Sequence, residues 1–283
     1  MSKPPLATPS RPRTVDEALE RAVLAFRMQR PEEAERLAGD VLKANPGDVR
    51  AAWVLGQVLL AQGRSDAAIE PLQRAARRSR DPAIETLLAR ALLNVGRGDD
   101  ALDQLRQAVT RRPAFETAFL ELGDQLGKGV RLDEALAVFE TGLVQLPHSV
   151  VLKMGLGYLH LDRNDRRQAR GLFLQVRAAA PERHDARIAL ANVMVLDGEY
   201  AAAADLYRLA LDLQPDDPMT RISLGKCLLE LGDRDQGEAA LRAVTRGEPL
   251  TTGLAITALA ASPHGRFFLR PSAAVKFLQA EPA

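Results

Sequence analysis

The chain has 283 residues, of which 27% are charged and only 4% are aromatic. Its formal net charge is +1, so no overall field draws the protein to nucleic acid or to an anionic membrane, and we expect neither as a partner. The single cysteine, Cys227, excludes an internal disulfide framework and suits a reducing compartment.

Residues 1–14 contain four prolines and three basic residues, and we expect them to form a disordered tail. They lack the apolar run of a secretory signal. No stretch of the chain approaches the ~18 apolar residues that span a bilayer. The nearest, 253–261, has nine residues. We therefore expect a cytoplasmic protein without membrane insertion.

From residue 15 onward, prolines recur every 34 residues. They are Pro113, Pro147, Pro181, Pro215 and Pro249, and Pro46 fits the same ladder. Each follows a stretch that indicates two short amphipathic helices, and its ring ends the second helix. The period predicts an all-α fold, an α-solenoid (superhelix) of about seven helix-turn-helix repeats over 15–249, in which neighbours bury a continuous core. The repeats are expected near 15–48, 49–81, 82–115, 116–149, 150–183, 184–217 and 218–249.

Two columns of small residues run through all of these repeats. The column on the first helix consists of Ala22, Gly56, Ala89, Gly123, Gly157, Ala191 and Gly225, and that on the second helix consists of Ala34, Ala68, Ala101, Ala135, Ala169, Ala203 and Gly237. Two helices approach closely only where small side chains meet, and a large residue there would cost ~1–3 kcal/mol. From the second repeat on, leucine precedes the first column, and Leu, Phe or Tyr follows the second by four residues. These large residues are the predicted hairpin core.

With leucine, small residue, alanine, aromatic or leucine, and proline in this register, the chain resembles the tetratricopeptide repeat over about five-sixths of its length. The resemblance implies that the first helices of all repeats line a concave groove that binds a protein or peptide. The aromatic residue that such repeats carry near the start of the first helix is present here only as Phe119. The other repeats have at this position residues that include Ala52, Glu85, Lys153, Arg187 and Arg221.

Two columns of the first helix are expected to face this groove. The polar column consists of Gln57, Arg90, Asp124, Tyr158, Asn192 and Lys226, and the column one turn earlier consists of Trp53, Thr86, Leu120, Met154, Ile188 and Ile222. An apolar strip beside hydrogen-bonding groups suits a bound peptide or helix, and the alternative is that the apolar residues pack between repeats. Trp53 stands one position after the usual aromatic site, a rotation of about 100° toward the groove. We therefore expect Trp53 to anchor a partner.

Residues 250–283 lie beyond the last period and are expected to form capping helices and a tail. The stretch 250–261 indicates a helix, and Ser272 is the expected N-cap of another. Between them, Phe267, Phe268 and Leu269 either fold over the open end of the last repeat or form a docking motif for a partner. Capping is what the end of a solenoid requires.

The chain shows no motif for catalysis, a cofactor or a metal. Its four histidines form neither an HExxH pair nor a cluster with cysteine, and no glycine-rich phosphate loop follows a strand. Cys227 is flanked by apolar residues and is expected to be a small core residue. We therefore expect no catalytic residue, no cofactor and no metal site.

The sequence thus predicts a non-catalytic adaptor or scaffold that binds a peptide or helix of a partner protein in its groove. The alternative is an accessory or regulatory subunit that docks on an enzyme through Phe267, Phe268 and Leu269 and presents or senses its substrate. An enzyme in its own right is a third class. The sequence leaves open whether two solenoids form a homodimer.

Overall fold

The computed structural model describes residues 14–245, 249–268 and 270–280, and within these ranges it contains helices and no β-strand. The all-α fold class predicted from the repeat is confirmed, and the helices follow one another in antiparallel pairs. Of the expected disordered tail at residues 1–14, residues 1–13 lie outside the described residues, as does Leu269. Thr14, by contrast, is the N-cap of α1 and accepts a hydrogen bond from Glu17 N.

Contacts divide the chain into two compact units, an N-terminal unit that ends at Ser149 and a C-terminal unit that begins at Val150. The N-terminal unit consists of α1 (Val15–Arg27), α2 (Pro31–Ala44), α3 (Val49–Ala61), α4 (Ser65–Arg78), α5 (Pro82–Asn94), α6 (Gly98–Ala108), α7 (Glu116–Lys128) and α8 (Leu132–Gln145). The C-terminal unit consists of α9 (Val150–Asp162), α10 (Arg166–Ala179), α11 (His184–Leu196), α12 (Tyr200–Leu213), α13 (Pro218–Glu230), α14 (Arg234–Ala243), α15 (Pro249–Ala261) and α16 (Pro271–Gln279).

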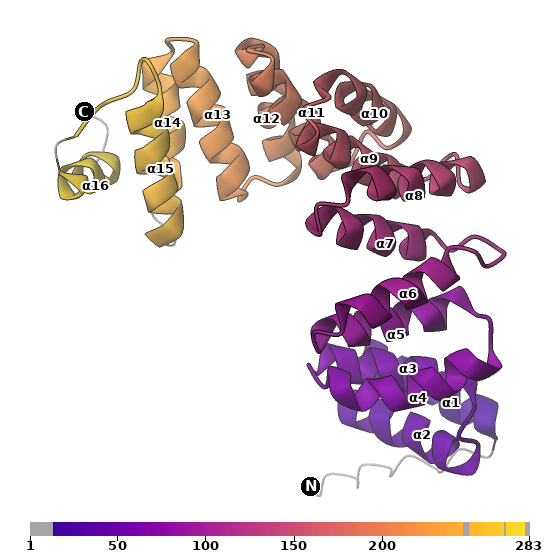
Figure 1. The fold of residues 1–283 in the computed structure, drawn as a ribbon. Coiled ribbons are helices and arrows are strands. Elements are labelled where there is room, and N and C mark those ends of the chain that lie inside the picture. Colours follow the sequence, from indigo (N-terminus) through magenta and orange to yellow (C-terminus); the bar gives the residue numbers. More distant parts are fainter. Residues whose placement is uncertain (1–13, 246–248, 269, 281–283) are drawn as a thin grey trace, which may run out of the picture. The chain divides into compact units, whose positions relative to one another are not determined.

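Within each unit the helices stack by one rule. Each first helix packs against the second helix of its own pair, and that second helix packs against the first helix of the next pair, as α3, α4 and α5 do (Figure 1). In the N-terminal unit the first helices α1, α3, α5 and α7 also contact their neighbours directly. This arrangement leaves one side of these first helices free of any second helix.

The small columns are the points of closest approach within each pair. Every residue of both columns is buried. A Cβ atom built on Gly157 would lie 2.5 Å from the ring of Phe173, and one built on Gly123 would overlap the ring of Phe139 in the same way. Glycine thus occupies the two positions of the first column that face a phenylalanine of the second helix. No alanine could be placed there without moving a buried ring.

Acidic residues begin many of the helices. The carboxylates of Asp48, Asp81 and Asp217 accept hydrogen bonds from the first turns of α3, α5 and α13, and each such cap stabilises a helix by about 1 kcal/mol. An acidic residue is also the second residue of five second helices. These residues are Glu32 of α2, Asp66 of α4, Asp99 of α6, Asp133 of α8 and Asp235 of α14. Negative charge is favourable there because it faces the positive end of the helix dipole.

The turn inside each pair contains a left-handed residue that the sequence analysis missed. These residues, one per pair, are Gln29, Gly63, Gly96, Val130, Asn164, Gly198 and Gly232, with φ between 57° and 82°. After each of them the chain donates a hydrogen bond back to the last turn of the first helix, as Arg131 N does to Leu126 O at 2.9 Å. Glycine occupies this position in four of the seven turns, and in the sequence it could have indicated the left-handed conformation. Valine at this position is strained, because a β-branched side chain disfavours positive φ.

The C-terminal end is closed by α15, α16 and a buried carboxylate. Glu238 of α14 accepts hydrogen bonds from Arg234 at 3.2 Å and from Arg266 at 2.5 Å, and it lies 3.6 Å from Arg242. The guanidinium groups of Arg242 and Arg266 lie 4.5 and 4.6 Å from the ring centre of Phe277 on α16. This network ties α16 and the segment before it to α14.

At the C-terminal end the structure contradicts the expectations for Pro249 and Ser272, and it gives Phe267 and Phe268 different surroundings. Pro249 is the first residue of α15, where a proline needs no hydrogen-bond partner, and does not close the preceding helix. Ser272 lies inside α16, whose N-cap is Arg270. Phe268 packs beside Phe277 on the apolar cluster of α13, α14 and α15, whereas Phe267 is 79% exposed.

We predict that Val130→Gly stabilises the protein by about 0.5–1 kcal/mol. The side chain is 82% exposed, so the change removes left-handed strain of ~1–2 kcal/mol without losing packing, offset by the greater flexibility of glycine in the unfolded chain. Urea denaturation followed by circular dichroism measures the difference. Val144→Gly is the matched control, because Val144 is equally exposed but lies inside α8, where glycine should destabilise by about 0.5 kcal/mol. Equal losses in both variants would contradict the prediction.

We also predict that Glu238→Gln loosens the C-terminal end. Removing the charge leaves Arg234, Arg242 and Arg266 without their common carboxylate and should cost about 1–3 kcal/mol, a range lowered for the partial exposure of the arginines. Hydrogen exchange should accelerate in α15 and α16 and stay unchanged in α1–α8. Glu140→Gln, at an exposed position of α8, is the control and should change neither region.

Candidate functional site

The first helices α1, α3, α5 and α7 of the N-terminal unit line a groove of about 780 Å³. Its apolar lining includes Val23, Trp53, Ile84 and Phe115, one from each first helix or its cap. The groove falls on the side of the first helices that their second helices do not cover. A volume of ~300–1,000 Å³ is typical of ligand sites in proteins.

Trp53 of α3 is the largest side chain of this groove and is 38% exposed. The residue before it, Ala52, is fully buried, so the two faces of α3 at this point are the hairpin core and the groove. A partly exposed tryptophan on an apolar wall has free area that a ligand can cover, and such residues dominate the binding energy of many protein interfaces.

Polar side chains border the apolar floor. Gln57 of α3 and Arg90 of α5 line the groove, and Arg90 Nε donates to Glu121 Oε1 of α7 at 3.1 Å. The second carboxylate oxygen of Glu121 is buried and has no hydrogen-bond partner among the described residues. Thr86 donates its hydroxyl to the Pro82 carbonyl at 2.7 Å, so its polar atom is already satisfied within α5.

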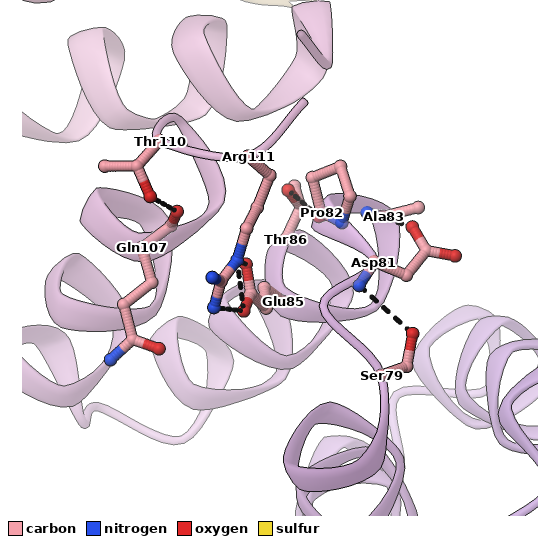
Figure 2. A network of polar contacts seen from close by, with 9 residues as sticks. All are labelled: Ser79, Asp81, Pro82, Ala83, Glu85, Thr86, Gln107, Thr110 and Arg111. Atoms are coloured by element: carbon pink, nitrogen blue, oxygen red, sulfur yellow. Dashed lines mark hydrogen bonds and ion pairs between the residues drawn. The ribbon is translucent and has the colours of Figure 1, made fainter. Parts of the chain in front are cut away.

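The start of α5 is held in place by an ion pair between the buried Glu85 and the partly exposed Arg111. Arg111, in the segment after α6, donates to both carboxylate oxygens of Glu85 at 2.6 to 3.2 Å, as Figure 2 shows. Hydrogen bonding to the buried Glu85 and its negative charge raise the pKa of Arg111. Asp81, capping Ala83, stands at the same end of α5 in Figure 2 and also lines the groove. The ion pair therefore orients one wall of the groove.

Glu85 occupies the position where the tetratricopeptide pattern has an aromatic residue. Two other residues of this column also make polar contacts: Arg187 donates to the carbonyl oxygens of Leu209 at 2.6 Å and of Pro181 at 2.7 Å, and Arg221 donates to that of Pro215. Arginine thus replaces ring packing by hydrogen bonds to carbonyl oxygens inside α12 or in the segments that follow α10 and α12. The sequence indicated the departure from the aromatic pattern but not the partners, which lie six residues away at Pro181 and Pro215 and more than 20 residues away at Leu209 and Arg111.

The structure brings together four residues of the two columns predicted from the sequence, Trp53, Gln57, Thr86 and Arg90. Leu120 and Asp124 stand on α7 and are not part of the lining of this groove. Partial burial raises the pKa of Asp124, and the nearby positive charge of Lys128 opposes this shift.

The remaining predicted residues belong to the C-terminal unit and divide into two groups. Tyr158, Asn192 and Lys226 are exposed, although Asn192 accepts a hydrogen bond from the hydroxyl of Tyr207 at 2.6 Å. Burial of the less exposed part of the ring, with the negative charge of Asp185 nearby, raises the pKa of Tyr158, whose ring centre lies 5.3 Å from that of Phe173.

The apolar residues predicted for the groove in this unit pack between helices instead of facing a ligand. Met154 and Ile222 are only 5% exposed and lie in apolar clusters, and Ile188 is partly buried against one of them. Unlike Trp53, these three side chains are covered by neighbouring helices. A ligand could reach Met154 or Ile222 only if those helices moved.

The described residues offer little for chemistry. No three His, Cys, Asp or Glu side chains among them come together in a way that could hold a metal ion. Burial raises the pKa of Cys227 to about 11, so its thiol stays protonated and unreactive at neutral pH. Within the part of the chain that the structure describes, every helix is too short or too polar to cross a membrane.

A family model described as tetratricopeptide repeat matches residues 19–82, 86–149 and 154–218, and a second model with the same description matches residues 194–261. The second match ends at the last residue of α15. A comparison with curated protein sequences gives no match.

Solved structures share the fold at low sequence identity. The Cut9-Hcn1 hetero-tetramer of the APC/C has a TM-score of 0.64 and 15% identity, over 88% of this chain and 50% of that chain. Human IFIT1, solved as a dimer with m7Gppp-AAAA, has a TM-score of 0.62 and 15% identity over 87% of this chain. The match spans 62% of the IFIT1 chain. The pilF protein of Pseudomonas aeruginosa has a TM-score of 0.61 and 18% identity, over 70% of this chain and 90% of that chain. At such identities the likeness shows the fold alone.

Trp53 is the only tryptophan of the chain, so its fluorescence reports directly on the groove. We predict that acrylamide quenches this emission readily in the folded protein, because the ring is 38% exposed. A ligand that fills the groove should protect it. Emission as poorly quenched as that of a fully buried tryptophan would contradict the exposure.

Proposed function

The chain belongs to the tetratricopeptide repeat family, whose repeats mediate protein–protein interaction or scaffolding, and from this premise we propose that it is a non-catalytic adaptor that binds a peptide or helix of another protein. The proposed site is the groove lined by α1, α3, α5 and α7, which we call the Trp53 groove. We further propose that the repeat array extends over residues 15–249, with capping helices after it.

The observation that carries this proposal is the partial exposure of Trp53 on an apolar wall. Covering an aromatic side chain with a ligand removes apolar area from water, and such an anchor contributes about 2 kcal/mol to binding. Gln57 and Arg90 stand beside it and can fix the orientation of a ligand through hydrogen bonds. An apolar floor with a few polar groups at its border is the usual composition of a protein-binding groove.

We extend the proposed partner-binding set beyond this groove. Leu120 and Asp124 on α7 continue the same columns, and Tyr158, Asn192 and Lys226 offer exposed polar groups on the C-terminal unit. Met154, Ile188 and Ile222, which pack against their own unit, would act by supporting the helices that carry these groups.

A second candidate function is an accessory subunit that docks on an enzyme through the C-terminal segment. The supporting observation is Phe267, which is 79% exposed while its neighbour Phe268 packs against the cap. A phenylalanine so exposed has free area for a partner.

We predict that Trp53→Ala weakens binding of the cellular partner about 30-fold, which corresponds to about 2 kcal/mol. Partners are captured with the intact protein, identified by mass spectrometry, and their affinity for each variant is measured by calorimetry. Leu209→Ala, at an exposed apolar position of α12, is the control and should bind normally.

Two other results would contradict the groove as the site. Unchanged affinity of Trp53→Ala with a large loss of melting temperature would show that Trp53 serves packing alone. Normal binding by Trp53→Ala with loss of binding by Phe267→Ser would favour the accessory-subunit function. Circular dichroism must show that each variant is folded.

A further inference from the structure

The N-terminal unit contains a second cavity, of about 400 Å³, on a different face of α5 from the Trp53 groove. Glu85, Leu88 and Leu92 of α5 line it, and none of the three lines the Trp53 groove. The other lining residues come from α4, from α6 with its N-cap, and from the segment after α6. They are Gln73, Ala76, Arg77, Arg97, Asp100, Asp103, Gln104, Gln107 and Arg111. We call this site the Arg77 cavity, and its volume falls within the ~300–1,000 Å³ typical of small-molecule sites.

Two departures from the repeat pattern give this cavity its polar character. Glu85 occupies the usual aromatic position of the first helix, and Gln104 lies three residues after the small residue Ala101 of the second helix. In the other six repeats the position of Gln104 holds an apolar residue, namely Leu37, Pro71, Val138, Leu172, Leu206 or Ala240. Both departures fall in the pair α5 and α6, and both line the cavity. The repeat fold forms elsewhere in the chain without these two polar side chains.

The charge that remains uncompensated in this lining is positive. Each acidic residue of the lining is paired with an arginine, and the pairs are Glu85 with Arg111 at 2.6 Å (Figure 2), Asp100 with Arg97 at 2.7 Å, and Asp103 with Arg106 at 2.9 Å. Arg77 of α4, in contrast, forms no ion pair or hydrogen bond with any residue that the structure describes. Its guanidinium can therefore bind the negative charge of a ligand, and its planar donors suit a carboxylate or a phosphate group.

Three glutamine amides of the lining also lack protein partners. Gln73, Gln104 and Gln107 make no side-chain hydrogen bond with the residues that the structure describes, and the first two are half-buried. A half-buried amide without a partner costs free energy, which the polar groups of a ligand would recover. Because an amide both donates and accepts, it suits hydroxyl groups. Among the described lining residues none is aromatic, so a planar base would find no ring on which to stack.

We propose that the Arg77 cavity binds a small hydroxylated organic anion, either a carboxylate or a phosphate ester. The guanidinium of Arg77 holds the anionic group, and the amides of Gln73, Gln104 and Gln107 exchange hydrogen bonds with the hydroxyl groups. This site is separate from the Trp53 groove, and the proposal does not depend on the function proposed above.

The test is a calorimetric titration of the intact protein with citrate, glucose 6-phosphate and inorganic phosphate at equal ionic strength. Citrate and glucose 6-phosphate distinguish a carboxylate from a phosphate ester, and glucose is the neutral probe. The same titrations are made with Arg77→Gln and with Gln104→Glu, which has nearly the same size as the native residue. Arg74→Gln is the matched control, because Arg74 lies on α4 one turn before Arg77 but outside the lining.

Citrate or glucose 6-phosphate should bind more tightly than inorganic phosphate and glucose. Arg77→Gln should weaken this binding about five- to tenfold, since it removes a charge-assisted hydrogen bond at an exposed position. Gln104→Glu should weaken it about tenfold, because its negative charge would lie next to the anion. Arg74→Gln and Trp53→Ala should bind within about twofold of the intact protein.

Three results would overturn the inference. The first is an absence of binding by all of the probes at about 10 mM. The second is equal affinity for glucose and for the two organic anions. The third is an affinity that Arg77→Gln and Gln104→Glu leave unchanged, or that Arg74→Gln lowers as much as Arg77→Gln does, because the anions would then be attracted only by general surface charge.

Gln104→Leu provides a readout that does not depend on the choice of probe. It introduces the type of residue that other repeats carry at this position, so it should raise the melting temperature of the protein without ligand and abolish anion binding. A lower melting temperature would show that Gln104 serves the fold and would contradict its assignment to a ligand.

Discussion

The close approach of two helices at a pair of small residues is the constraint on which the rest of the structure depends. In each pair a buried Ala or Gly on the first helix faces the second helix. Next to it lies a large core side chain of the second helix, as Phe173 lies against Gly157. Because these large side chains fill the space between the two helices of a pair, the opposite side of the first helix does not take part in packing within the pair. That side becomes available for neighbouring repeats or for a ligand.

Two buried carboxylates, Glu85 and Glu238, determine local geometry. Glu85 and Arg111 join α5 to the segment after α6, and Glu238 gathers three arginines beside Phe277 at the C-terminal end. A buried ion pair adds little net stability, because desolvation offsets its attraction, but it tolerates few alternative arrangements. Its contribution here is to orient the helices that it joins, including one wall of the Trp53 groove.

The same column can serve packing in one repeat and recognition in another. Trp53, Thr86, Met154 and Ile222 are equivalent in the repeat, yet Trp53 is partly exposed while the others are buried. The difference comes from the surroundings of each side chain. The exposure of a side chain in this column therefore depends on the neighbouring side chains more than on the residue type.

The sequence by itself determined the helix pairs, their period and the small columns, because these follow from local spacing that recurs along the chain. It also indicated that Trp53 departs from the usual aromatic position by one residue, and hence by a large rotation on the helix. Only the tertiary structure decided which apolar positions are covered, as at Met154 and Ile222, and which charges are paired. Glu85 meets Arg111 across 26 residues, whereas Glu20 and Arg27 remain unpaired among the described residues, and no local pattern distinguishes the two cases. Burial and pairing depend on side chains that folding brings together from distant parts of the chain, and for this reason the site had to be found in three dimensions.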